Sequence, residues 1–379
     1  MNSQAATSEP LAASDFRCGT LAFIESNRAL CGEAGYRYSR LCRRATLYSS
    51  CYAILTRHLL GDLESLTQGE RRDWLAFFNS YQDEDGLFRD PVIYGEGWYK
   101  GDPAWCGRMH LTCHVISAMA SLGGVAQRPI RHIEPYCDAG FLVDWLERRP
   151  WGGDIATVGN EIMNIGVLLQ YVRDFQANKA AAPAVEVLLN WLGSNYISSR
   201  TGLWGELDVG DKNRLSRAVM GAYHWWPLFF YDGVPVPFIE RAIDSVLLTQ
   251  NPNGGFGWGV HNGAEPFNSS ACEDIDSIDP LVRMSALTDY RRDDIRKAIV
   301  KAAHWVMRNR QADGGFVFIL GRPFRYGHDE LDGPADWGAM FPTWFRTLSL
   351  ALMEKAAGTI VTGNARWCFN ACPGMQFWR

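Results

Sequence analysis

The chain alternates between two kinds of apolar segment, and this alternation predicts a protein of paired helices. In both kinds the apolar residues recur every three or four positions, which is the spacing of an α-helix. Segments of the first kind are rich in Ala, Met, Cys, Ser and aromatic residues and carry few charges. They are Leu47–Leu60, His110–Leu122, Glu161–Phe175, Ser216–Tyr231, Cys272–Leu287 and Trp337–Lys355. Segments of the second kind mix apolar with charged residues. They are Glu70–Tyr81, Gly140–Arg148, Pro183–Asn195, Pro237–Thr249 and Asp294–Arg310.

The contrast between the two kinds predicts an inner ring of buried helices wrapped by an outer ring of amphipathic ones. No convincing period-two pattern runs through the chain, so the expected class is all-α, with about five to six helix pairs. We expect residues 1–16 to be a disordered lead-in, residues 17–356 to form the helical ring, and residues 357–379 to be a tail packed on it.

A short phrase recurs between the segments: a glutamine, a few polar residues, a glycine and an aromatic residue. It occurs at Gln82–Phe88, Gln250–Phe256 and Gln311–Phe316, with weaker copies at Trp151–Gly153 and Thr201–Trp204. The glycines of the five copies lie roughly 50 to 66 residues apart, which indicates a repeated architecture. Glycine permits a sharp turn after an outer helix, and the glutamine can bind backbone groups at a neighbouring helix end.

This phrase resembles the QW motif of the terpenoid cyclase and protein prenyltransferase superfamily. Members of that superfamily are α/α toroids, in which helix pairs surround a central cavity. The resemblance spans roughly Leu47 to Lys355. It implies the same toroid here, with a cavity inside the inner ring.

A second resemblance concerns an acidic run, Cys272-Glu-Asp274-Ile-Asp276-Ser277-Ile-Asp279. It is similar to the Asp-x-Asp-Asp motif of squalene–hopene-type and class II diterpene cyclases, except that Ser277 replaces the last aspartate, which oxidosqualene cyclases also lack. The resemblance implies that Asp276 is the acid that protonates an alkene or epoxide and that Asp274 tunes it. Asp279 is a further candidate, because crowded carboxylates cannot all ionise and one of them keeps its proton.

The same acidic residues also suit a purely structural role. Ser270 and Glu273 form a capping box, and acidic residues favour helix N-termini. Asp279-Pro280 reads as an N-cap followed by proline, so the helix either begins there or continues with a kink. The sequence leaves both possibilities open.

A carbocation needs aromatic faces around it and no water. His110 and His114 lie one helical turn apart and share a face. The alternative for the aromatic residues is that they are ordinary core. The candidate substrate-binding residues are His114, Tyr223, His224, Trp225, Trp226, Phe230 and Trp337.

Neither a metal nor a cofactor is expected. The zinc-dependent prenyltransferases have Asp-x-Cys on one inner helix and a histidine on a later one. Here Asp276 takes the place of the cysteine, and the last inner segment, Asp336–Pro342, has no histidine. Cys272, Asp274 and His328 would have the wrong order for that motif. No DDxxD-type magnesium motif appears either.

Composition limits which binding partners and which cellular compartment we expect for this protein. A net charge of −5 gives no support for nucleic-acid binding. No apolar run is long enough to span a membrane, although peripheral contact stays possible. Ten cysteines, together with an N-terminus that does not resemble an export signal, favour reduced thiols and a cytoplasmic protein.

The sequence therefore favours an acid-initiated cyclase or isomerase that acts on a small hydrophobic isoprenoid or polyene. A carbohydrate-active toroid, either a glycoside hydrolase or a polysaccharide lyase, is the first alternative, since the 15 tryptophans suit sugar stacking. A toroid that binds a ligand without catalysis is the second.

Overall fold

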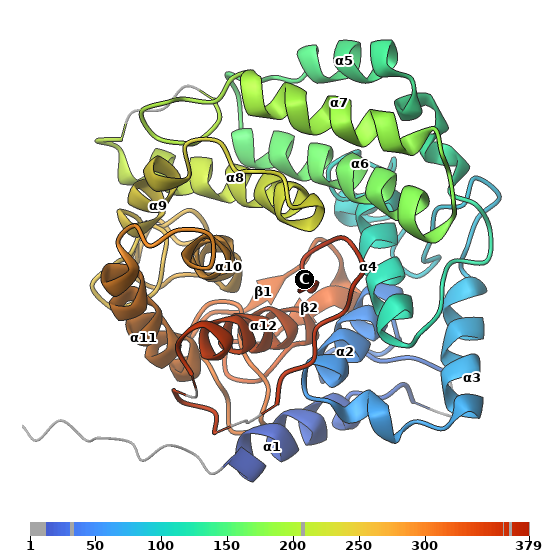
Figure 1. Cartoon of the computed structure of the whole chain (residues 1–379). Coiled ribbons are helices and arrows are strands. Elements are labelled where there is room, and N and C mark those ends of the chain that lie inside the picture. The colour runs from blue at the N-terminus through green and yellow to red at the C-terminus, as the bar shows by residue number, and fades with distance from the viewer. Residues whose placement is uncertain (1–12, 31–33, 206–208, 359, 364–365, 379) are drawn as a thin grey trace, which may run out of the picture.

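The computed structural model describes residues 13–30, 34–205, 209–358, 360–363 and 366–378. Within these residues twelve α-helices form two concentric rings, as Figure 1 shows. The inner helices are α2 (Leu47–Leu59), α4 (Arg108–Ser121), α6 (Ile155–Phe175), α8 (Lys212–Asp232), α10 (Ala271–Ser285) and α12 (Met340–Ala357). The outer helices are α1 (Ala13–Ser26), α3 (Gln68–Asn79), α5 (Ala139–Glu147), α7 (Ala181–Ser194), α9 (Ile239–Leu247) and α11 (Arg292–Arg308).

Each inner helix packs against the next inner helix in chain order, and α12 packs against α2, which closes the ring. The remaining elements are short. They are the 3₁₀ helices η1 (Asp62–Ser65), η2 (Gly97–Tyr99), η3 (Arg131–Cys137) and η4 (Asp329–Leu331), and an antiparallel pair of strands, β1 (Phe324–Arg325) and β2 (Asp332–Gly333). The predicted α/α toroid is confirmed.

The six segments of the first kind are the inner helices, and the five of the second kind are outer helices. Two inner helices begin earlier than the segments predicted for them, because an aspartate caps a turn that precedes each segment. Asp154 accepts from the Ala156 N–H, and Asp211 accepts from the N–H groups of Asn213 and Arg214. The apolar pattern alone does not mark such a turn.

The sixth outer helix, α1, is absent from the segments that the sequence predicts. It begins at Ala13, inside the segment expected to be a lead-in; residues 1–12 of that segment lie outside the described part of the chain. α1 is needed because the ring closes on it. The turn after α11 packs Gly314 against the Gly19 backbone of α1.

Four of the five recurring glycines have a common physical reason, whereas Gly152 has no positive φ and nothing near its Cβ position. Gly86, Gly202, Gly254 and Gly314 all have positive φ values, between 67° and 97°. A Cβ on any of them would also overlap the backbone of the following outer segment, at Pro129, Ala242, Lys301 and Gly19 respectively. Glycine therefore both makes the turn and lets neighbouring helix pairs approach closely.

In two copies the glutamine binds backbone groups as predicted, although none of them is at a neighbouring helix end. Gln82 Nε2 donates to the carbonyls of Gly86 and Arg128, and Gln250 Nε2 donates to those of Gly254 and Ala298. In each case the second carbonyl belongs to the next repeat.

The third copy has a different register. Gln82 pairs with Phe88 and Gln250 with Phe256, but Phe316 pairs with Arg310 and not with Gln311. Arg310 reaches the Phe16 carbonyl of α1, a bond that links the end of the ring to its beginning. The glutamine at position 311 is thus one residue out of phase with the repeat.

Candidate active site in the ring lumen

The lumen of the ring holds a cavity of about 210 Å³. Five inner helices each contribute a pair of residues one turn apart, and α6 and α8 each add a third residue, Thr157 and Tyr223. The pairs are His110 and His114, Ala156 and Asn160, Met220 and His224, Cys272 and Asp276, and Phe341 and Phe345. All of the paired residues except His224 lie in the N-terminal halves of their helices, so the cavity lies toward that end of the lumen.

Loops at the same end complete the wall with aromatic side chains. Trp98 and Trp105 come from the loop before α4, and Phe318, Phe324 and Tyr326 from the segment between α11 and α12. The two loops are joined, since Trp98 N–H donates to the Gly327 carbonyl at 3.2 Å and the Trp98 and Tyr326 rings lie 5.5 Å apart.

Asp276 is the only carboxylate on the cavity wall among the described residues. Burial raises the pKa of Asp276 well above its usual value, and three carboxylates on the same helix raise it further. They are Glu273, Asp279 and Asp274. No hydrogen bond and no cation in the described part of the chain opposes the shift. The Asp276 carboxyl therefore keeps its proton to higher pH than a free aspartate does.

Asp274 has a different environment, although it lies only two residues away. Its carboxylate is completely buried and accepts from Phe256 N–H, Ser269 Oγ, Trp305 Nε1 and Arg346 Nη1, all within 3.0 Å. Burial raises the pKa of Asp274, and these donors, the Arg346 guanidinium above all, oppose that rise by stabilising the anion. Asp274 joins α10 to α11, to α12 and to the turn that precedes α10.

The repeat explains this role. Thr112 Oγ1 accepts from Phe88 N–H and Thr343 Oγ1 from Phe316 N–H, each at 2.9 Å, as Asp274 does from Phe256 N–H. Asp274 thus occupies the threonine position of its repeat. Two residues further along are His114, Asp276 and Phe345, all of which line the cavity.

Asp279 does not line the cavity. It forms an ion pair with Arg283, and Arg283 also donates to the carbonyls of Met375 and Phe377 in the C-terminal segment. Pro280 lies inside α10, which continues to Ser285, so Asp279 is not an N-cap. The capping residue is Ser270, which forms the expected capping box with Glu273.

Histidines occupy the wall opposite Asp276, since α4 and α10 are separated by two inner helices in either direction around the ring. His110 Nδ1 lies 2.8 Å from Tyr48 Oη, and His110 Nε2 lies 3.4 Å from His114 Nε2. Burial lowers the pKa of His114 to about 3 and that of His224 to about 4. Both imidazoles are neutral at pH 7, and a neutral imidazole can accept a proton.

The predicted substrate-binding residues separate into two groups. His114, Tyr223 and His224 line the cavity, and the buried Tyr223 hydroxyl has no hydrogen-bond partner among the described residues. The other group lies elsewhere. It comprises Trp225, Trp226, Phe230 and Trp337, none of which is on the cavity wall.

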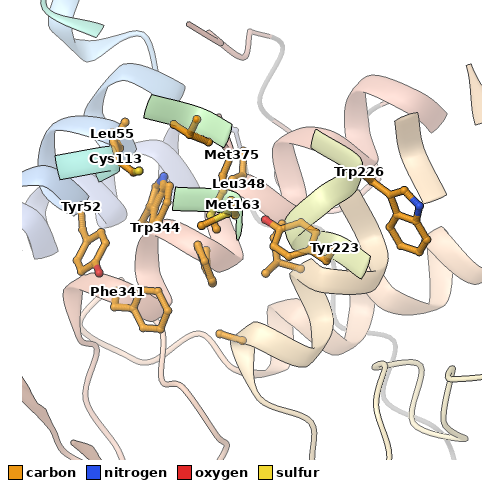
Figure 2. Close-up of a cluster of buried hydrophobic side chains, with 14 of the residues drawn as sticks. Tyr52, Leu55, Cys113, Met163, Tyr223, Trp226, Phe341, Trp344, Leu348 and Met375 are labelled. Atoms are coloured by element: carbon orange, nitrogen blue, oxygen red, sulfur yellow. The ribbon is translucent and has the colours of Figure 1, made fainter. Parts of the chain in front are cut away.

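Each residue of the second group has another packing role. Trp225 and Trp226 lie against Trp204, and the Trp226 indole points away from the cluster around Tyr223 in Figure 2. Phe230 lines an outer groove, and the half-exposed Trp337 stacks on the Arg40 guanidinium. Consecutive residues of a helix cannot all face one side, so only part of the aromatic run of α8 reaches the lumen.

The sequence reasoning missed the loop residues of the wall, Trp98, Trp105, His261, Phe318, Phe324 and Tyr326. They have no helical periodicity, and the one available signal is that their loops precede inner helices. Among the described residues no group of three or more His, Cys, Asp or Glu is placed to hold a metal ion. No described helix combines the length and the apolar character needed to cross a membrane.

No protein-family model matches the sequence, and no curated protein matches it. Solved structures match at the level of the fold. A glycosyl hydrolase family 88 protein from Bacteroides vulgatus has a TM-score of 0.52 at 11% identity, over 91% of this chain and 99% of that one. A wild-type glycosidase has a TM-score of 0.50 at 13% identity, over 91% and 97%.

The type II terpene cyclase MstE from Scytonema has a TM-score of 0.45 at 14% identity, over 91% of this chain and 98% of that one. This value is too low to carry an argument. Because all these identities are below 15%, the comparisons establish the α/α toroid and leave the chemistry to the site itself.

Proposed function

We propose that the chain is an acid-initiated cyclase or isomerase of a small isoprenoid, with Asp276 as the proton donor. The observation that carries this proposal is the buried Asp276 carboxyl, whose pKa is raised and which has no hydrogen-bond or cationic partner among the described residues. It opens onto a cavity whose described lining is mostly aromatic and contains no lysine, arginine or second carboxylate. The aromatic faces of such a wall stabilise a cation.

The reaction is redox-neutral. The Asp276 O–H gives its proton to one carbon of an alkene, and the positive charge forms on the more substituted carbon. A second alkene of the same molecule attacks this carbon and closes a ring. Loss of a proton from a carbon beside the new cation then gives an isomer of the substrate. Asp276 is left as the carboxylate and regains a proton before the next cycle.

His114 is suited to take the last proton. It is neutral, it lines the wall opposite Asp276, and its bond to His110 continues to Tyr48. A base across the cavity from the acid accepts a proton from the far end of the folded substrate, so Asp276 need not both give and remove a proton at one place.

The carbohydrate-active alternative is supported by one observation. Trp98 and Trp105 lie on the wall beside Asn160 and His261, a combination that suits sugar stacking and hydroxyl recognition. The usual glycosidase mechanisms, however, need two carboxyl groups on either side of the bond that breaks. Asp274 and Asp279 are committed to Arg346 and Arg283, so Asp276 has no second carboxylate to work with.

The test is incubation with geranyl and farnesyl diphosphates, the corresponding alcohols and squalene, with product analysis by mass spectrometry. We expect cyclised or double-bond-shifted isomers from the wild type and a loss of about a thousandfold or more in Asp276→Asn, since a positioned acid contributes roughly 10²–10⁴-fold. Trp226→Phe, which lies outside the cavity, is the control. Full turnover by Asp276→Asn would refute the acid assignment. Cleavage of an oligosaccharide, with every isoprenoid untouched, would establish the alternative.

A further inference from the structure

The C-terminal segment, residues 366–378, fills the half of the lumen that the cavity leaves free. Figure 1 shows this end of the chain at the centre of the ring. Asn370 Nδ2 donates to Ser117 Oγ at 3.0 Å and to Ser121 Oγ at 3.1 Å on α4. Gln376 Nε2 donates to the Leu55 carbonyl of α2 at 3.0 Å. The partners on the inner helices all lie in the C-terminal halves of α2 and α4.

The other side of the segment is held in the same way. Gln376 Oε1 accepts from Trp344 Nε1 of α12 at 2.7 Å. Arg283 of α10 donates to the carbonyls of Met375 and Phe377, and the Phe377 ring lies 5.3 Å from that of Tyr231 on α8. Five of the six inner helices therefore contact the segment, which is placed inside the ring and not on its surface.

Met375 is the residue where the segment meets the cavity. Its side chain lines the cavity wall and lies among Leu55, Trp344 and Leu348 in Figure 2. The flanking side chains are buried and paired, since Gln376 has both of its amide atoms bonded and Cys372 is fully buried. A segment fixed by buried polar bonds on several helices cannot move aside without leaving these groups unpaired.

This arrangement also gives a role to the Asp279–Arg283 pair. Arg283 is buried and donates two hydrogen bonds to main-chain carbonyls of the segment. Asp279 accepts a hydrogen bond from the same guanidinium and holds it in place. The acidic run of α10 thus has three separate uses along one helix: Asp274 joins the repeats, Asp276 faces the cavity and Asp279 secures the segment below it.

We propose that residues 366–378 are a stopper that limits the size of the molecule in the cavity, with Met375 as the specificity-determining residue. The cavity of about 210 Å³ is smaller than most ligand pockets, which hold roughly 300–1,000 Å³. Because an apolar cavity of about 150 Å³ holds the six carbons of benzene, this one suits about eight carbon atoms, which is closer to a ten-carbon chain than to a fifteen-carbon one. The stopper selects a ten-carbon isoprenoid over a fifteen-carbon one. The chemical class rests on the proposed function.

Binding of saturated chains tests the stopper without any chemistry, because a saturated chain cannot be protonated. The probes are tetrahydrogeraniol and hexahydrofarnesol, the ten- and fifteen-carbon isoprenoid alcohols without double bonds, measured by titration calorimetry. In an unrestricted apolar pocket five more carbon atoms strengthen binding by roughly 1,000-fold. We expect the wild type instead to bind the ten-carbon alcohol about tenfold more tightly than the fifteen-carbon one.

Met375→Ala removes Cγ, Sδ and Cε from the wall and is expected to shift the ratio of the two affinities by at least about tenfold toward the longer chain. Met375→Val, which removes less volume and perturbs folding less, is expected to give a smaller shift in the same direction. Met284→Ala is the control: Met284 is fully buried, lies on α10 and does not line the cavity, so the ratio should stay at the wild-type value.

The outcomes separate the two proposals. An affinity ratio that is the same in the wild type, Met375→Val and Met375→Ala overturns the stopper alone. A size preference that follows Met375, combined with full turnover by Asp276→Asn, supports the stopper and overturns the acid. If neither alcohol binds to any variant, the cavity does not take isoprenoid chains and both proposals fail.

Discussion

Removing the charge of Asp274 should destabilise the fold, whereas the same change at Asp276 should not. In Asp274→Asn the buried Arg346 guanidinium loses its anion and keeps only backbone carbonyls as acceptors. Oδ1 of Asp274 accepts from Phe256 and Ser269, and Oδ2 from Trp305 and Arg346. Whichever way the new amide turns, its NH₂ group faces two donors.

The size of the effect follows from the burial of the pair. Breaking a buried ion pair by removing one partner costs about 3–5 kcal/mol, because the other charge stays buried and uncompensated. An unfolding entropy of about 2.1 cal/mol/K per residue amounts to roughly 0.8 kcal/mol/K over the 379 residues. The expected fall in Tm is therefore about 4–6 °C.

The assay is chemical denaturation of Asp274→Asn, Asp276→Asn and the wild type at pH 7, followed by tryptophan fluorescence. Asp276→Asn should be as stable as the wild type or more stable, because it replaces a buried acid that has no partner. A double variant, Asp274→Thr with Arg346→Leu, should lose less than the sum of its single variants, since both charges are then gone and Thr is the side chain of the equivalent positions. Equal stability of Asp274→Asn and Asp276→Asn would refute the assignment of Asp274 to architecture.

Three further outcomes are expected. The pKa of Asp276 is raised above its unfolded value near 3.8, so the stability tied to its proton is complete below that value and is lost as pH rises toward the folded pKa. The stability of Asp276→Asn relative to the wild type should therefore grow as pH rises above the unfolded pKa in denaturant titrations, and a constant difference would contradict the shift. Gly123→Ala should lower the free energy of unfolding by about 1–2 kcal/mol, the backbone strain alone, because nothing lies near its Cβ position. Gly314→Ala should lower it at least twice as much, as measured by calorimetry, and equal losses would contradict the close approach of Gly314 to α1. His114→Phe should still consume substrate but change the product distribution seen by mass spectrometry, and an unchanged distribution would exclude His114 as the final base.

Most of the fold could be predicted from the sequence, because it depends on the spacing of apolar residues within each helix. All six inner helices and five of the six outer ones were predicted from period and charge alone, since a buried helix and a half-exposed helix differ in composition. Helix α1 was not predicted, because the contact that defines its role is with the other end of the chain. It is the neighbour of the last turn only when the ring closes.

The site was readable only in part. Asp276, His114, Tyr223 and His224 do line the cavity, but their motif neighbours do not. Nothing local distinguishes Asp274 from Asp276, since both are acidic residues near one helix start. The distinction arises from Arg346, which lies 72 residues away on another helix.

The sequence by itself determined the repeat, its helix pairs and the position of an acidic inner helix, because these depend on contacts within one repeat. Only the tertiary structure decided which carboxylate meets a cation and which meets an empty cavity. It also decided that the C-terminal segment enters the lumen, where Met375 borders the cavity. The physical reason is the same in both cases. The pKa of a carboxyl and the size of a cavity depend on side chains brought together from distant parts of the chain, and their identity is known only after the ring has closed.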